Sequence, residues 1–293
     1  MRSLLRFGAL SLAVTFIAAC GSSTPATPAT TASTAASSMN PSMSMPTGTM
    51  STDTMSTGME MGDTPPATGL TIDTSTREFA PGAAADLNFK IIAADGSTIN
   101  EYEVEQTKEL HLILVRSDLT EYQHLHPIRA ADGTWSIPVT FAKGGTYRMV
   151  ADFVPVIDGA ATGRTAVTTD LTVTGTGTDT PLPAPASTTT VDGYTVTIAG
   201  DLTAATESDL TFTVNDAAGR PVVLEPYLGA FGHLVAFAQS DLAYKHIHPS
   251  SAKDNDGILV FTGQVTTPGM HRLFMQFAAG GSVHTAEFTA NAS

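Results

Sequence analysis

Cysteine is nearly absent from the sequence, because Cys20 is the only one among 293 residues. A folded region without cysteine has neither a disulfide nor a free thiol, so packed hydrophobic cores must supply its stability. The lack of a thiolate also excludes cysteine nucleophiles and blue copper sites, since a blue copper site needs a cysteine ligand.

Basic residues are also scarce. The chain has 14 Lys and Arg against 28 Asp and Glu, a net charge of −14 with histidine neutral. Nucleic acid is therefore not an expected partner. The acidity favours solubility and the attraction of cations.

Long hydrophobic runs are missing except at the start of the chain. Arg2 and Arg6 precede an apolar run at 7–19 that is too short to span a membrane. The run ends in IAAC, which resembles a bacterial lipobox, so we expect a lipoprotein signal peptide at 1–19 and an acylated Cys20 as the mature N-terminus. An ordinary small-residue cleavage site is the alternative. The lipobox interpretation places the mature chain outside the cytoplasm, held at the membrane by its lipid.

Residues 20–67 lack aromatic and basic side chains and consist mostly of Ser, Thr, Ala, Pro, Gly and Met. This composition cannot form a core, so we expect a disordered tether. Thioether sulfur is a soft ligand for Cu(I), and close pairs in this segment are candidates for binding it: Met43, Met45, Met59 and Met61. Drifted low-complexity sequence is the alternative explanation.

The rest of the chain contains one unit twice, at 68–173 and 191–293, joined by a Pro- and Thr-rich linker at 174–190. ADLNFKIIAADGSTI matches SDLTFTVNDAAGRPV, and GGTYRMVADF matches TPGMHRLFMQF. Each unit alternates apolar and polar residues in short runs separated by turn sequences, without helical periodicity. We therefore predict an all-β protein with two tandem antiparallel β-sandwich domains, immunoglobulin-like or cupredoxin-like.

The stretch HLILVRSDLTEYQHLHP brings three histidines together in the first unit. If SDLT is a four-residue hairpin loop, Arg116 pairs with Glu121 and His111 lies opposite His126. Alternate residues of a strand share a face, so His124 then joins the same face. A slip of one residue would send His111 to the other face.

The second unit repeats this arrangement in HLVAFAQSDLAYKHIHP, with His233, His246 and His248. Either QSDL or SDLA can be the loop there, and both place all three histidines on one face. His271 and His284 occur in the second unit only, and either would add a fourth nitrogen if it faced the three.

Three neutral imidazoles on one face favour coordination of Cu(II) or Zn(II). The alternative is a hydrogen-bonded corner, in which the histidines tie a hairpin to a neighbouring loop and Pro127 and Pro249 end strands. The two histidine stretches resemble a segment of bacterial secreted and lipid-anchored proteins associated with heavy-metal and copper handling. Small periplasmic copper carriers are similar in architecture, although their ligand spacings differ. The resemblance implies a metal-linked role without naming a reaction.

Three functions remain open. The first is a protein that buffers, sequesters or delivers envelope copper, with a metal ion, the membrane and another metal-handling protein as partners. The second is a structural or interaction protein with structural histidines. The third is an enzyme resembling copper-zinc superoxide dismutase, but its bridging histidine and zinc aspartate have no counterpart here, so no catalytic residue is assigned.

Overall fold

The computed structural model describes residues 67–253 and 256–293, and every described residue within these ranges lies in a strand, turn or loop. By contacts between residues, all the described residues belong to one compact unit. No helix among them is long and apolar enough to cross a membrane. The predicted signal peptide, Cys20 and the methionine pairs lie outside the described residues.

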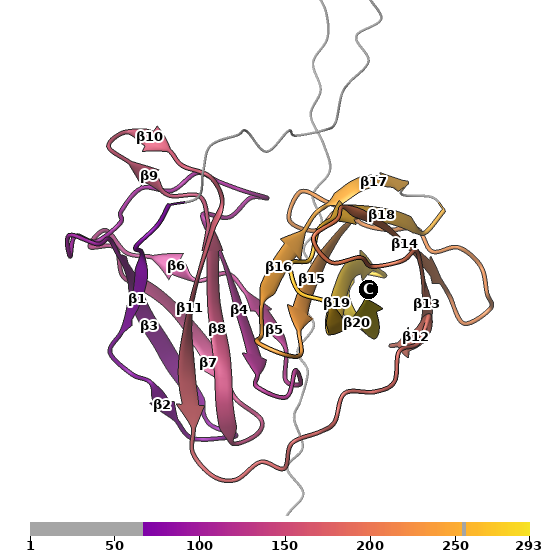
Figure 1. Ribbon diagram of the computed structural model, residues 1–293, viewed down its shortest axis with the longest axis horizontal. Coiled ribbons are helices and arrows are strands. Elements are labelled where there is room, and N and C mark those ends of the chain that lie inside the picture. The colour runs from indigo at the N-terminus through magenta and orange to yellow at the C-terminus, as the bar shows by residue number, and fades with distance from the viewer. Residues whose placement is uncertain (1–66, 254–255) are drawn as a thin grey trace, which may run out of the picture. The chain divides into compact units, whose positions relative to one another are not determined.

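The first domain is a sandwich of two sheets with one small hairpin (Figure 1). One sheet has the order β1-β3-β7-β6, formed by Thr71–Thr74, Ala84–Ile92, Trp135–Thr140 and Ile128–Arg129. The other has the order β2-β11-β8-β4-β5, formed by Glu78–Phe79, Thr165–Val173, Gly145–Phe153, Leu110–Arg116 and Gln123–Leu125. The hairpin joins β9 (Val156–Ile157) and β10 (Ala160–Ala161). This strand order is that of an immunoglobulin-like sandwich.

The second domain repeats the architecture in β12 to β20. One sheet has the order β12-β13-β14-β18-β17, formed by Thr188–Val191, Tyr194–Ala199, Ser208–Asn215, Ile258–Gly263 and Pro249–Lys253. The other has the order β16-β15-β19-β20, formed by Tyr244–Ile247, Gly232–Ala238, Gly269–Ala279 and Ser282–Ala292. The all-β tandem sandwich predicted from the alternating pattern is confirmed. The second sandwich begins at Thr188, inside the segment predicted as linker.

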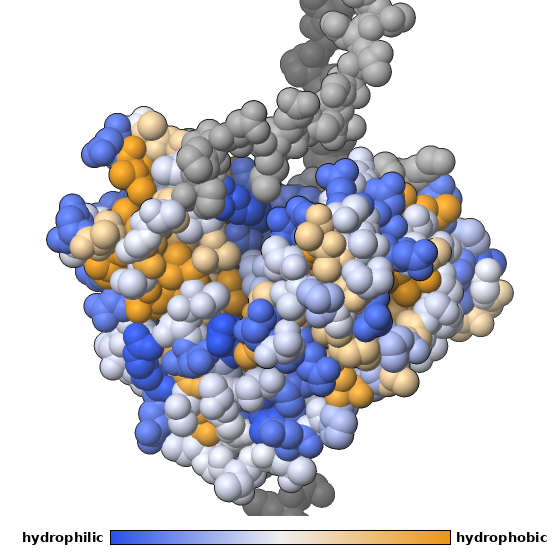
Figure 2. Space-filling view, in the orientation of Figure 1, coloured by the Kyte–Doolittle hydropathy of each residue, from blue (hydrophilic) through white to orange (hydrophobic). Residues whose placement is uncertain are grey.

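Each sandwich has its own core between its two sheets. Phe89, Trp135 and Phe153 are among the buried residues of the first core, and Phe212, Phe261 and Phe277 are among those of the second. Among the residues that the structure describes, the large hydrophobic residues with exposed side chains are Val104, Ile128, Val223 and Val283. In Figure 2 hydrophobic residues gather on the left of the visible face, and hydrophilic and weakly polar residues make up much of the rest. Burial between sheets is thus what holds each domain together.

A third apolar cluster joins the two sandwiches. It contains residues of β4, of the turn after β4 and of β8 from the first domain, and residues of β15 and β19 from the second: Ile113, Val115, Leu119, Val150, Val235, Phe237 and Phe274. Tyr122 stacks on Phe274 across this junction with ring centroids 4.1 Å apart. We call the seven buried residues given above the interface cluster. Because of it, β4 is buried on both faces, with every residue from Leu110 to Arg116 inaccessible.

Candidate metal centre

The hairpin register that clusters the histidines is present in both domains. In the first, Ile113 pairs with His124, which places His111 opposite His126 as the SDLT loop predicts. In the second, Val235 pairs with His246, so QSDL is the loop. Leu119 and Leu242 take positive φ angles of 62° and 58° in the two turns. The structure therefore confirms the expected clustering and decides the loop of the second copy.

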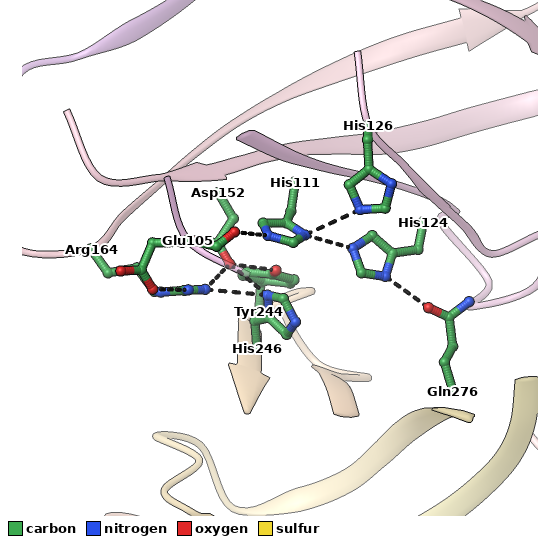
Figure 3. Close-up of polar contacts among 9 residues, drawn as sticks. All are labelled: Glu105, His111, His124, His126, Asp152, Arg164, Tyr244, His246 and Gln276. Atoms are coloured by element: carbon green, nitrogen blue, oxygen red, sulfur yellow. Dashed lines mark hydrogen bonds and ion pairs between the residues drawn. The ribbon is translucent and has the colours of Figure 1, made fainter. Parts of the chain in front are cut away.

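In the first domain the three histidines, here the first trio, direct one nitrogen each to a common point (Figure 3). Nδ1 of His111 lies 3.1 Å from Nε2 of His124 and 3.2 Å from Nε2 of His126. Nitrogens bound to one tetrahedral zinc ion at about 2.0–2.1 Å lie about 3.3 Å from one another. The two separations from His111 are therefore close to those of ligands around a single ion.

Each imidazole of the first trio has an inner nitrogen, which faces the other two histidines, and an outer nitrogen, which faces away. A hydrogen bond at the outer nitrogen determines that the inner nitrogen keeps its lone pair. Nε2 of His111 lies 3.1 Å from the carbonyl oxygen of Glu105, so it carries the hydrogen and Nδ1 is free to ligate. Nδ1 of His124 lies 2.7 Å from Oε1 of Gln276, so Nε2 is free. Two lone pairs then face each other at 3.1 Å without a hydrogen between them. A cation at that point would relieve their repulsion.

The second trio consists of His233, His246 and His248, whose ligating atoms also lie within 4.8 Å of one another. Its inner nitrogens are Nδ1 of His233, Nε2 of His246 and Nε2 of His248, the same atoms as in the first trio. All three are buried and have no hydrogen-bond partner among the described residues. A buried polar atom without a partner costs about 1–3 kcal/mol, so three such atoms in one cluster are placed where they could hold a cation.

Burial keeps these histidines neutral. It lowers the pKa of His126 and His248 to about 3 and that of His233 to about 4, with nearby positive charges and other histidines adding to the effect. The pKa of His111 is lowered by the same cause, and the pKa values of the two middle histidines, His124 and His246, fall well below the usual 6.5. Imidazole coordinates metal only when neutral, so the whole set is in its ligating form near pH 7.

The two trios lie beside each other at the junction of the domains. The ring centroid of His246 is 5.3 Å from that of His111 and 5.6 Å from that of His124. The sequence predicts a shared face for the three histidines of each unit and does not say whether that face is exposed. In the structure His111, His233 and His246 are buried, with His111 and His233 each only 1% exposed, because each domain covers the histidine face of the other.

A polar network surrounds the second trio. Oδ2 of Asp152 accepts hydrogen bonds from Nδ1 of His246 at 3.0 Å, the hydroxyl of Tyr244 at 2.9 Å and Arg164 at 3.0 Å (Figure 3). Arg164 also donates to Glu105 at 2.8 Å. Asp152 and Gln276 were not identified from the sequence, although they occupy matching positions in the two aligned strands GGTYRMVADF and TPGMHRLFMQF. Each pairs with the first histidine of its own domain.

The two remaining histidines belong to neither trio. Nδ1 of His271 lies 3.0 Å from the carbonyl oxygen of Gly269. His284 bonds to Asp192 through Nδ1 at 2.8 Å and to the carbonyl oxygen of Ala279 through Nε2 at 3.1 Å. With its ring nitrogens engaged in this way, His284 ties together loops of the second sandwich. Neither residue supplies a fourth nitrogen to the second trio.

Comparison with known proteins gives a family and several distant folds. The profile of a family described as "Domain of unknown function (DUF8832)" matches residues 66–173 and 189–293. No curated protein matches the chain.

Among solved structures, the chain is similar to FdeC, an Escherichia coli adhesin, at 18% identity over 77% of this chain and 64% of that one, with a TM-score of 0.25. It is similar to the Yersinia pseudotuberculosis adhesin InvE at 13% identity over 76% and 59%, with a TM-score of 0.23. It also matches fibronectin(III)-like modules of Clostridium thermocellum CbhA at 13% identity over 76% and 92%, with a TM-score of 0.22. The chain spans less than two thirds of both adhesin chains. At TM-scores this low the matches indicate nothing about activity or partners.

Proposed function

The chain belongs to the family described as a domain of unknown function (DUF8832), whose domain it carries twice, and we propose that it is an extracytoplasmic metal-binding protein holding one ion at each trio. The observation that carries this proposal is the second trio, whose three inner nitrogens converge, are buried and have no partner among the described residues. The first trio directs the same three ring atoms to one point.

Copper is the proposed ion, with zinc as the other candidate. Each trio offers three nitrogens and no thiolate, and for such ligands the affinity of divalent first-row metals peaks at copper. Three protein ligands leave a coordination position open to an exchangeable ligand. An open position suits a protein that buffers, sequesters or hands on its ion to another envelope protein.

Metal titration of the full chain, purified without a chelating tag, tests this function. We expect two equivalents of Cu(II) or Zn(II) for the unaltered protein and one for the double variant His124→Ala/His126→Ala. The control is His284→Gln, which changes a buried histidine outside both trios and should keep two equivalents. Unchanged stoichiometry in the double variant would remove the basis for the proposal.

A structural or interaction protein is the second candidate. Immunoglobulin-like sandwiches serve widely as interaction modules, and the fold fits that use. Several outer nitrogens also make structural bonds, such as that from His233 to the carbonyl oxygen of Tyr227 at 3.1 Å. This candidate forecasts no metal binding by the unaltered protein and a lowered melting temperature for the same double variant, because buried partners lose their hydrogen bonds.

The proposed location depends on Cys20. Acylation there would hold the two domains at the outer side of a membrane, where they meet envelope metal. The Cys20→Ala variant should leave the membrane fraction when cells are separated into soluble and membrane fractions. If the variant stays in the membrane fraction, Cys20 is not the anchor.

A further inference from the structure

The middle histidine of each trio is oriented by a side chain of the other domain. Asp152 lies on β8 of the first domain, and its Oδ2 accepts from Nδ1 of His246 in the second. Gln276 lies on β19 of the second domain, and its Oε1 accepts from Nδ1 of His124 in the first. Each domain therefore supplies one hydrogen-bond acceptor to the middle histidine of the other domain.

These reciprocal contacts between the domains follow from the packing of equivalent strands against one another. Asp152 pairs with His111 in the β4–β8 ladder, and Gln276 pairs with His233 in the β15–β19 ladder. Apart from Leu119 in the turn after β4, the interface cluster is built from residues of these same four strands. When the two sheets pack face to face, Asp152 therefore contacts the ring of His246, and Gln276 contacts the ring of His124.

A hydrogen bond at the outer nitrogen of a ligating histidine sets the tautomer, aims the inner nitrogen and raises its basicity. A carboxylate does this more strongly than an amide oxygen, since hydrogen bonds to charged acceptors are about twice as strong as neutral ones. Asp152 is itself 1% exposed and is held by Arg164 at 3.0 Å and Tyr244 at 2.9 Å. His111 and His233 do not distinguish the trios, because each bonds to a backbone carbonyl oxygen.

We infer that Asp152 and Gln276 are positioning residues acting across the domain junction, and that the carboxylate of Asp152 makes the second trio the tighter metal site. This inference rests on the proposed function. Removal of a partner of this kind lowers metal affinity by about 10–100-fold. The loss should appear in the domain opposite to the substitution.

Two full-length backgrounds isolate the sites. His124→Ala/His126→Ala leaves the second trio, and His246→Ala/His248→Ala leaves the first. In the His124→Ala/His126→Ala background, Asp152→Asn keeps the side-chain shape and removes the charge of the acceptor, so it should weaken Zn(II) binding to the second trio by up to about tenfold and change the electron paramagnetic resonance spectrum of bound Cu(II). In the His246→Ala/His248→Ala background, which leaves the first trio, Gln276→Met keeps the side-chain volume and removes the acceptor. It should weaken Zn(II) binding by a similar factor.

Asp170→Asn is the matched control for charge, because Asp170 pairs with Arg148 on the same sheet and contacts neither trio. It should change the affinity of either background by less than about twofold, as expected for screened, distant charges. Melting of each metal-free variant reports its folding, and the Gln276→Met measurement stands independently if Asp152→Asn does not fold.

The result that supports the inference is crossed: Asp152→Asn weakens the trio of the second domain and Gln276→Met that of the first. Loss confined to the substituted residue's own domain would overturn it, as would unchanged affinities. In those cases two equivalents still bind to the otherwise unaltered protein and the proposed function survives. If the unaltered protein binds no Zn(II) or Cu(II), the proposed function itself fails.

Discussion

The two trios present the same ring atoms in different surroundings. In the first, the inner nitrogen of His111 lies within 3.2 Å of both other histidines. In the second, the three inner nitrogens have no partner among the described residues, and the middle histidine bonds to a carboxylate in place of an amide. The hairpin register brings the three histidines of each trio together, whereas the opposite domain provides their surroundings. The copies should therefore share stoichiometry and differ in affinity.

The largest expected effect separates the two sites. His246→Ala/His248→Ala should remove one metal equivalent and leave the weaker site, whereas His124→Ala/His126→Ala should remove one and leave the tighter site, because the carboxylate supports only the second trio. Competition titrations with a chromogenic chelator measure the stoichiometry and the remaining affinity together. Equal affinities in the two variants would show that Asp152 and Gln276 are equivalent in effect.

Acidification should destabilise the metal-free protein. The folded state lowers the histidine pKa values, to about 3 for His126 and His248 and about 4 for His233, against about 6.5 in the unfolded chain. Below pH 6.5 the unfolded state therefore binds more protons, so stability is complete above that pH and declines as the pH falls toward 4 and then 3. Urea unfolding at a series of pH values measures the slope, which should be shallower in either double variant. A flat profile would contradict the burial of the trios.

The apolar junction should be asymmetric as well. Phe274 of the second domain is fully buried and stacks on Tyr122, whereas its counterpart in the first domain is the smaller Val150. Phe274→Ala should lower the free energy of unfolding by about 3–5 kcal/mol, and Val150→Ala by less, because the larger deletion leaves the larger cavity. Val223→Ala, at an exposed position, is the control and should stay within about 0.5 kcal/mol. Equal losses of unfolding free energy from Phe274→Ala and Val150→Ala would contradict a larger contribution of Phe274 to the junction.

The smallest difference concerns the two turns. Asp118 is half-buried, with its side chain 5% exposed, and bonds to Arg116, but the second hairpin has Ala238 in place of the arginine, and Asp241 is exposed and bonds to the amide of Ala243. Asp118→Asn should cost about 1.5–3 kcal/mol of folding stability, because it weakens a buried charged hydrogen bond. Asp241→Asn should cost under about 0.5 kcal/mol. Denaturant unfolding compares the two, and a larger loss from Asp241→Asn would reverse this assignment.

Much of the candidate site is predictable because it depends on local geometry. Alternation along His124 and His126, together with a short loop after Arg116, is enough to place the first trio on one face. The burial of that face was not predicted. A signal for it exists in the unbroken apolar runs of β4 and β15, which favour strands covered on both faces. The positions of His271 and His284 could not be decided from sequence, because their distance from the trio depends on which strands are neighbours.

The sequence by itself determined the sandwich class, the duplication and the histidine spacing that can place each trio on one face, since side-chain alternation and turn length act over a few neighbouring residues. Only the tertiary structure decided that the trios are buried side by side and that Asp152 and Gln276 each serve the opposite domain. The physical reason is that hydrogen bonds such as those from His246 to Asp152 and from His124 to Gln276 join residues far apart in the chain. They form only when two sheet faces pack together, and no local pattern specifies that packing.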